Sequence, residues 1–351
     1  MSRANYVYES SQQSILRPLY RRFLWNRILD VLPNSLSPNA MTLISTFCCA
    51  VSFGLSATLR HNPLALSTAA VLVLAYVTLD NLDGAHARRL GRGTRLGEFL
   101  DHWLDTLNNG FIVLGGCMAA GLPPLLTLGV LCFGTLAFFS VQWELRQTGV
   151  FRTGRVADIE GNTTVALLYV VLAVFGADVL VATFIAGVSL AVWMSVGVIA
   201  QALWTFFSAV RRVTESRADF LPVLFTHLAL ILWAATGGLS PVAYLAVAFF
   251  LNPVFTARPV VGRLLGKTTP RLDWVVVGAL AATAGFAAFG ALPIAQDAAA
   301  YAVATVLAAI TLRHFASTVA ALRGEPVLVD TTLEPLPPVD GQPSAELRLA
   351  G

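Results

Sequence analysis

Four aspartates lie close together in the stretch DNLDGAHARRLGRGTRLGEFLDHWLD, which covers residues 80–105. Asp80 and Asp83 end one apolar run, and Asp101 and Asp105 lie inside the next. Carboxylates crowded in this way repel one another unless cations neutralise them. Two divalent cations would balance the four charges, and a ligand set made only of oxygen suits the hard ions Mg²⁺ or Mn²⁺. The aspartates therefore predict a two-metal site of the kind that binds a diphosphate.

Helical geometry brings the two pairs of aspartates face to face. At about 100° per residue, Asp80 and Asp83 share one stripe of a helix, while Asp101, Asp105 and the preceding Gly97 share another. The connection between the two apolar runs is short, so we expect the two helices to be antiparallel neighbours. Their acidic stripes would then face each other, which predicts four carboxylates around shared ions.

Small residues and an arginine follow the first pair. Gly84 and Ala87 leave room for a flat or bulky group beside the helix, and the planar guanidinium of Arg88 suits a phosphate. These residues predict a nucleotide diphosphate site that faces the cytoplasm. A single Asp-Gly is more often a turn, and a single Asp at a helix end is more often a cap. Four aspartates at this spacing, two of them inside an apolar span, favour the metal site.

The composition indicates which elements must hold this site. Of 351 residues, 56% are hydrophobic and 12% are charged, against about 25% charged in soluble domains. The mean hydropathy is +0.70. These values argue against a water-soluble enzyme, a disordered regulator and a nucleic-acid binder, so no nucleic-acid partner is expected. We predict an all-α fold, a polytopic membrane helix bundle whose surrounding partner is the lipid bilayer.

Apolar runs of about 20 residues are long enough to span a bilayer. Before the first run, Ser14–Val31 alternates large apolar side chains with arginines, which predicts an N-terminal helix lying in the membrane interface. Asp178 is the only polar break between the fifth and sixth runs, so their division is the least defined. The ten predicted spans are 40–59, 63–82, 97–120, 123–144, 163–180, 183–208, 219–237, 241–260, 273–294 and 297–320.

Basic residues occur in every second connection between these spans. Twenty-two of the 23 Lys and Arg residues fall on one side of the predicted membrane, and Arg60 alone falls on the other. Because basic loops stay in the cytoplasm, this distribution predicts that both termini are cytoplasmic. An arginine-rich composition with a single lysine points to the inner membrane of a bacterium.

The chain is expected to have four parts, which differ in hydropathy and composition. These are a cytoplasmic N-terminal segment with the interfacial helix (1–38), a catalytic core of six membrane helices (39–210), additional membrane helices (211–323) and a disordered, Pro- and acid-rich cytoplasmic tail (324–351).

Several other polar residues have no matched partner in the sequence. Asp158 and Glu160 precede the fifth span and are interpreted as part of a solvated loop. Asp178, His227 and Asp297 lie in or near spans and are interpreted as satisfied structural groups.

The acidic stretch contains the complete pattern D-x2-D-G-x2-A-R-x8-G-x3-D-x3-D. In this pattern the chain resembles the CDP-alcohol phosphotransferase family. Two further segments, LPNSLSPNAMTLIS ending at Ser45 and QWELRQTGVFRTG at 142–154, resemble the eukaryotic-type choline/ethanolamine phosphotransferase branch. The resemblance covers about residues 6–160.

The resemblance implies a membrane-embedded helical enzyme with two Mg²⁺ or Mn²⁺ ions. The four aspartates match the metal-binding positions of the family, and Asp105 also matches the residue assigned as the base for the acceptor hydroxyl. The resemblance also implies that the protein forms a homodimer. The residues that match nucleotide-contacting positions are Gly84, Ala87, Arg88, Thr94, Asn39 and Thr42.

One position departs from the resemblance. Choline and ethanolamine phosphotransferases tend to carry His immediately before the Trp of the second segment, and this chain has Gln142 there. Gln cannot take a proton at neutral pH, so the acceptor and its proton route stay open. His102 and Glu144 are the nearest candidates to substitute. His102 has an alternative role as a hydrogen-bond partner of a metal-bound Asp, and Glu144 is equally well interpreted as an ordinary residue at a span end.

The implied reaction moves a phospho-alcohol group from a CDP-linked donor, of the CDP-choline or CDP-ethanolamine type, to a lipid hydroxyl such as that of diacylglycerol, and releases CMP. One alternative is a CDP-diacylglycerol-dependent phosphatidyltransferase that acts on inositol, serine or glycerol phosphate. A remoter alternative is a membrane prenyltransferase, whose acidic motifs lie farther apart. A transporter with aspartate proton relays would predict an inverted repeat, which the sequence lacks.

Overall fold

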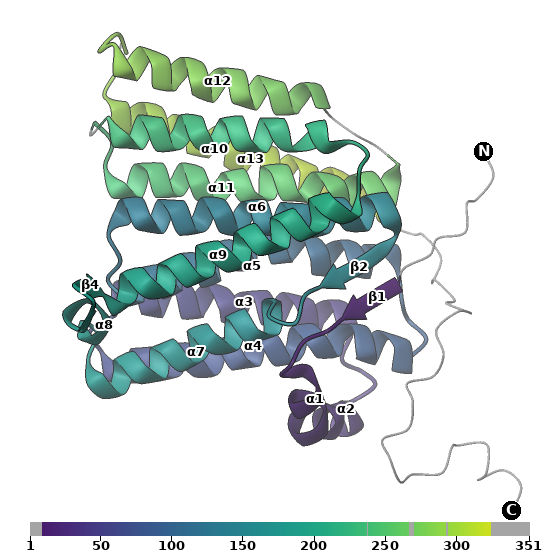
Figure 1. The fold of residues 1–351 in the computed structure, drawn as a ribbon. Helices are drawn as coiled ribbons and strands as arrows, with labels where there is room; N and C mark the ends of the chain where they lie inside the picture. Colours follow the sequence, from purple (N-terminus) through teal and green to yellow (C-terminus); the bar gives the residue numbers. More distant parts are fainter. Residues whose placement is uncertain (1–8, 237, 267–269, 293, 324–351) are drawn as a thin grey trace, which may run out of the picture.

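A computed structural model describes residues 9–236, 238–266, 270–292 and 294–323. Within these residues, ten long helices lie side by side in one bundle, and most of them run nearly parallel or antiparallel to their neighbours (Figure 1). They are α3 (Pro38–Thr58), α4 (Pro63–Arg89), α5 (Arg95–Ala119), α6 (Pro124–Thr148), α7 (Asp158–Phe175), α9 (Leu190–Arg212), α10 (Phe220–Ala235), α11 (Pro241–Leu265), α12 (Pro270–Ala288) and α13 (Gln296–Leu322).

Each long helix corresponds to one of the ten predicted spans. Eight of them are long and apolar enough to cross a membrane. The other two are α5, which carries polar residues along much of its length, and α12, whose apolar part Asp273–Ala288 is shorter. The prediction of an all-α polytopic membrane bundle is confirmed. The tail predicted at 324–351 lies outside the described residues.

Short polar caps followed by proline begin several of the helices. Ser37 accepts a hydrogen bond from the backbone N–H of Ala40 at the start of α3, and Asn62 and Ser240 cap α4 and α11 in the same way. Proline follows each of these caps at the first helical position, where no intrahelical partner for an N–H is lost. These local signals place the ends of the helices, whereas hydropathy alone defines only their middles.

The break between the fifth and sixth spans is longer than predicted and covers residues 176–189. α7 ends at Gly176, whose φ of +97° favours glycine. A short helix α8 (Val179–Ala182) and a hairpin of β3 (Phe184–Ile185) and β4 (Val188–Ser189) then precede α9. The expected boundaries of 163–180 and 183–208 are therefore wrong at both ends. Uniformly apolar sequence gives no periodic signal for such a boundary.

The segment predicted to form an interfacial helix is helical, in three consecutive pieces. These are α1 (Arg17–Tyr20), the π-helical turn η1 (Arg21–Trp25) and α2 (Asn26–Val31). Phe23 is exposed, whereas Trp25 is buried and stacks on Tyr20 with ring centroids 5.1 Å apart. One face therefore packs on the bundle and the opposite face is free, as an amphipathic helix requires.

The N-terminal segment is joined to the bundle by Glu160, at the start of α7. Its carboxylate accepts hydrogen bonds from Ser14 Oγ at 2.5 Å and from the backbone N–H of Leu16 at 3.0 Å. Its other oxygen accepts from the backbone N–H of Ala157. Glu160 is 8% exposed, so the interpretation of this residue as part of a solvated loop is wrong. The N-terminal strand β1 (Glu9–Gln12) also pairs in parallel with β2 (Val150–Thr153).

The three residues interpreted as structural groups do have local partners. Asp178 forms an ion pair with Arg60 at 2.8 Å, in the connection between α7 and α8. Asp297 accepts a hydrogen bond from the backbone N–H of Ser240, and His227 Nδ1 lies 2.6 Å from the carbonyl oxygen of Val223. These contacts confirm the interpretation for Asp178 and Asp297, whereas His227 is satisfied only at Nδ1, because its buried Nε2 has no partner among the described residues.

Three apolar clusters form the core, and α5 lies among them. One cluster joins α3, α4 and α7 to the N-terminal helices, and a second joins α6 to α10, α11, α12 and α13. A third packs α5 against α11 and α13. α3 and α11 both pack directly on α5, so this helix is held between the N-terminal and C-terminal parts of the bundle.

Candidate active site

Three of the four motif aspartates come together between α4 and α5. Asp80, Asp101 and Asp105 each offer a carboxylate oxygen, and these three oxygens lie within 4.8 Å of one another. All three side chains are half-buried. Three hard oxygen donors at this spacing fit a divalent cation such as Mg²⁺ or Mn²⁺. The two helices thus present acidic stripes to each other, as their helical spacing predicts.

Asp105 is held in place by two side chains that the sequence analysis did not single out. Tyr76 donates its hydroxyl to Asp105 Oδ1 at 3.2 Å, and Asn108 Nδ2 lies 3.5 Å from the same oxygen. Tyr76 lies one turn before Asp80 on α4, and Asn108 lies one turn after Asp105 on α5. The sequence signal that could have identified Tyr76 and Asn108 is their position one helical turn from a motif aspartate.

Asp158 also acts on this cluster. It lies at the first position of α7 and is exposed, and its negative charge interacts with Asp80, Asp101 and Asp105. Its position beside the site depends on the packing of α7 on α4, which no local pattern indicates.

Asp83 lies apart from the other three aspartates in its contacts. It is 5% exposed and accepts a short hydrogen bond from the Thr42 hydroxyl of α3. Its other oxygen accepts from the backbone N–H of Gly84. That all four carboxylates surround shared ions therefore stays a prediction: three of them converge, while Asp83 is bound by protein donors beside them.

The residues expected to contact a nucleotide gather near the same ends of α3, α4 and α5. A Cβ at Gly97 would lie only 3.1 Å from Asn39 Oδ1 and 3.3 Å from Thr94 Oγ1. Thr94 caps α5 by accepting a hydrogen bond from the Gly97 backbone N–H at 2.9 Å. Gly97 is therefore the residue that lets α3 approach the start of α5, and Asn39 and Thr94 meet there.

Arg88 lies beside the first half of the motif. A Cβ at Gly84 would lie 3.5 Å from its Nη1. Arg88 is exposed, and Gly84 and Ala87 are half-buried. α4 continues past the predicted end of the span at residue 82 to Arg89, so all three residues lie on one continuous helix with Asp80.

His102 and Gln142 meet in the interior. Gln142 Nε2 lies 3.5 Å from His102 Nδ1, and both side chains are buried. The ring of Phe151 in β2 packs on the His102 ring with centroids 5.3 Å apart. His102 therefore lies next to the position at which choline and ethanolamine phosphotransferases tend to carry His.

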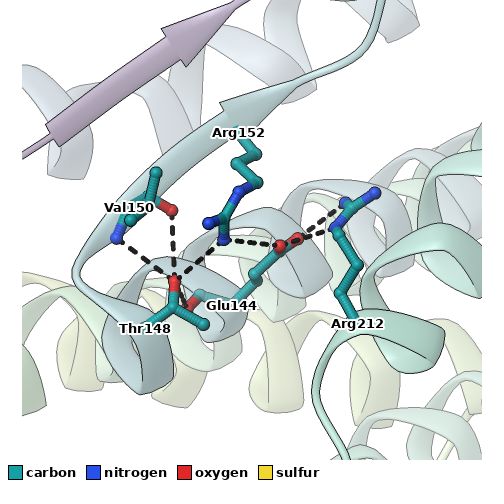
Figure 2. Close-up of polar contacts among 5 residues, drawn as sticks. All are labelled: Glu144, Thr148, Val150, Arg152 and Arg212. Atoms are coloured by element: carbon teal, nitrogen blue, oxygen red, sulfur yellow. Dashed lines mark hydrogen bonds and ion pairs between the residues drawn. The ribbon is translucent and has the colours of Figure 1, made fainter.

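Glu144 is buried and fully paired (Figure 2). Arg212 of α9 donates to its two oxygens through Nε and Nη2, both at 2.7 Å. Arg152 of β2 approaches Oε1 at 3.3 Å and also contacts the Thr148 hydroxyl. Both carboxylate oxygens are occupied by guanidinium donors, so the geometry disfavours Glu144 as an acceptor base and assigns it to an ion-pair cluster.

One protein-family model matches the part of the chain that holds these residues. Residues 35–194 match the model for CDP-alcohol phosphatidyltransferase, and this range contains every motif aspartate. Residues 35–194 are a CDP-alcohol phosphatidyltransferase domain. In the fold, the domain extends from the start of α3 into α9.

Individual relatives agree with this family. Cholinephosphotransferase 1 of Gallus gallus is 32% identical over 182 residues, which cover 49% of this chain and 53% of that protein. The CDP-alcohol phosphatidyltransferase class-I family protein 2 of Dictyostelium discoideum is 26% identical over 259 residues, or 67% of this chain and 61% of that protein. The expected similarity to the eukaryotic choline phosphotransferase branch is confirmed.

One similar protein carries the name of a different activity. The CDP-diacylglycerol–serine O-phosphatidyltransferase of Encephalitozoon cuniculi is 31% identical over 172 residues, which cover 46% of this chain and 43% of that protein. The chain thus matches about half the length of these relatives.

Proposed function

We propose that this protein transfers a phospho-alcohol group from a CDP-linked donor of the CDP-choline or CDP-ethanolamine type to a lipid hydroxyl such as that of diacylglycerol, and releases CMP. The observation that carries the proposal is the convergence of Asp80, Asp101 and Asp105 within 4.8 Å inside a CDP-alcohol phosphatidyltransferase domain. Similarity to cholinephosphotransferases supports the choice of donor.

Asp80, Asp101 and Asp105 would hold Mg²⁺ or Mn²⁺. Asp83 would contribute to the same metal site while it accepts the hydrogen bond from Thr42. A bound cation would draw charge from the diphosphate and stabilise CMP as it leaves. Gly84, Ala87 and Arg88 of α4, with Asn39 at the start of α3 and Thr94 at the start of α5, would bind the CDP moiety. The guanidinium of Arg88 suits a phosphate oxygen because it donates through a planar fork.

The acceptor hydroxyl must lose a proton as its oxygen attacks phosphorus. Asp105 is our candidate to accept that proton, because Tyr76 and Asn108 fix its Oδ1 by hydrogen bonds. His102 is the candidate to orient the acceptor. Its contact with Gln142 supports this role, because it brings an imidazole to the side chain that replaces the family's usual His.

A second candidate function is transfer of a phosphatidyl group from CDP-diacylglycerol to a small alcohol. The similarity to a CDP-diacylglycerol–serine O-phosphatidyltransferase favours it. The same aspartates would serve either reaction, since the diphosphate and the CMP leaving group are shared. The two functions differ only in which substrate carries the acyl chains.

We also propose that both termini face the cytoplasm of a bacterial inner membrane. Basic residues are concentrated at one end of the bundle, where α4, α6, α9 and α11 end. The exception, Arg60, lies at the opposite end and pairs with Asp178. The homodimer implied by the family stays a prediction.

The test is CMP release by the purified full-length protein in lipid nanodiscs with Mg²⁺. CDP-choline, CDP-ethanolamine and CDP-diacylglycerol are each offered with and without diacylglycerol or serine. We expect diacylglycerol-dependent CMP release from the first two donors, its loss in EDTA and its return with Mg²⁺. Asp101→Asn and Asp105→Asn should each lower the rate by about 100-fold or more.

Asp178→Asn is the matched control, because it removes the same charge at the opposite end of the bundle and should leave the rate unchanged. CMP release only from CDP-diacylglycerol with serine would establish the second candidate. Release of pyrophosphate in place of CMP, or full turnover in both site variants, would overturn the proposal.

A further inference from the structure

A small cavity lies between the N-terminal helices and α4, away from the aspartates. Its volume is about 50 Å³, which holds a few water-sized groups and is enough for a tetrahedral anion. α2 packs on α4 here, and Figure 1 shows α1 and α2 beside α4 at one edge of the bundle. Its polar lining consists of Arg17, Arg21, Trp25, Asn26, Asn81 and Arg88.

The lining has a chemistry that suits an anion. Three arginines supply positive charge and donors, and no acidic side chain is among the described residues that line the cavity, although Arg17 also interacts with the charge of Asp158. Trp25 is 3% exposed, and its indole Nε1–H has no acceptor in the part of the chain that the structure describes. A buried N–H without an acceptor is costly, so this donor calls for a ligand that accepts a hydrogen bond.

The cavity is a different site from the aspartate cluster. Asn81, Ala85 and Arg88 share a face of α4 that lies roughly a third of a turn from the stripe of Asp80 and Asp83. Arg88 lies at the boundary of the two faces, because its Nη1 is within 3.5 Å of the Cβ position of Gly84. A ligand in the cavity would therefore contact α4 from the side of the interfacial helix.

We infer that this cavity binds a phosphate group, held by Arg21, Arg17 and Arg88 and by the indole N–H of Trp25. The group comes either from an anionic lipid of the cytoplasmic leaflet or from free phosphate, which present the same oxygen acceptors. The exposed Leu19 and Phe23 of the same helical segment place the cavity at headgroup depth if they enter the bilayer. The aspartates take no part in the cavity, and Arg88 is the one residue of the proposed nucleotide site that also borders it, so the test below leaves Arg88 unchanged.

The test measures binding in EDTA, with no CDP-linked donor present. Inorganic phosphate is titrated calorimetrically into detergent-purified, delipidated protein. In a parallel arm, thermal unfolding is compared between phosphatidylcholine nanodiscs with and without phosphatidylglycerol. Arg21→Gln removes one charged donor, and Trp25→Phe keeps an aromatic ring but removes the N–H. Arg22→Gln is the matched control, since Arg22 is the adjacent residue, is exposed and lies over Phe23.

We expect Arg21→Gln to weaken binding by about tenfold or more and Trp25→Phe by about threefold to tenfold, with Arg22→Gln close to the wild type. If Arg21→Gln and Trp25→Phe lose only the stabilisation by phosphatidylglycerol, the ligand is a lipid headgroup. If they lose only the binding of inorganic phosphate, the ligand is free phosphate. Absence of binding in both arms of the wild type, or equal binding by Arg21→Gln, Trp25→Phe and Arg22→Gln, would overturn the inference. Both results leave the proposed transfer reaction untouched, since no readout uses CMP.

Discussion

Asp83 differs from the other motif aspartates in what binds it. Asp80, Asp101 and Asp105 face one another, whereas Asp83 accepts hydrogen bonds from the Thr42 hydroxyl and the Gly84 backbone N–H. The Thr42 oxygen also lies 3.2 Å from the carbonyl oxygen of Pro38 in the previous turn of α3, so its hydroxyl lies between α3 and α4. A threonine of α3 thereby sets the orientation of a carboxylate in α4.

Thr42→Val tests this arrangement, because valine keeps the shape of threonine and removes only the hydroxyl. Loss of a hydrogen bond to a charged acceptor costs about 1.5–3 kcal/mol, so we expect kcat/KM for CMP release to fall by roughly tenfold or more. The measurement is CMP release at varied donor and Mg²⁺ concentrations. Thr58→Val on the same helix is the control, since Thr58 bonds only to the Gly54 carbonyl oxygen among the contacts described. Equal rates for the two variants would contradict the role of Thr42.

At the scale of elements, Glu144 connects three segments. It lies on α6, and its partners Arg152 and Arg212 lie on β2 and at the end of α9 (Figure 2). β2 begins directly after α6, because Gly149 adopts a left-handed φ of +73° that turns the chain. Phe151 in the same strand then packs on His102. The ion pairs thus fix the strand that covers one side of the candidate acceptor region.

Arg212→Gln should lower the free energy of unfolding by on the order of 2–3 kcal/mol, because it leaves the buried Glu144 carboxylate with only Arg152. Adding Glu144→Gln should recover much of this loss, since two neutral amides remove the buried charge. Thermal unfolding of the detergent-purified variants measures both. Arg211→Gln changes the neighbouring exposed arginine and should have little effect. A double variant less stable than Arg212→Gln would contradict this account.

At the scale of the whole molecule, the C-terminal helices support the family domain. α11 lies beyond residues 35–194, yet Asn252 donates to the Thr106 carbonyl oxygen of α5 at 2.7 Å. A Cβ at Gly110 would lie 2.6 Å from Phe249 of α11, so only glycine permits this approach. Arg263 also pairs with Glu98 near the start of α5. The helix that carries Asp101 and Asp105 is therefore positioned partly by α11.

Gly110→Ala should destabilise the bundle by about 1–3 kcal/mol through overpacking against Phe249, and should lower CMP release by shifting α5. Phe249→Leu in the same chain makes room for the added methyl group and should restore both stability and rate. Thermal unfolding and CMP release are compared with Gly129→Ala, because a Cβ at Gly129 meets no atom within 4 Å. Equal stability and equal CMP release in Gly110→Ala and Gly129→Ala would contradict the claim that the close contact of α5 and α11 positions α5.

The sequence by itself determined the membrane class, the ten helices and the pairing of the motif stripes. Each of these depends on local regularities. A bilayer requires long apolar helices, and helical spacing places Asp101 and Asp105 on one face. Prediction from the sequence failed for the end of α7 at Gly176, because local signals are weak within continuous apolar sequence. It also failed for Glu160, whose burial depends on Ser14 far away in the chain.

Only the tertiary structure decided which groups meet across helices. It paired Thr42 with Asp83, Glu144 with Arg212, and Tyr76 with Asp105, and it formed the basic cavity beside α4. The physical reason is that periodicity gives the face of a helix but neither its neighbour nor its rotation against that neighbour. Those depend on close packing between residues far apart in the chain, where one missing side chain, as at Gly110, permits a contact that no local pattern specifies.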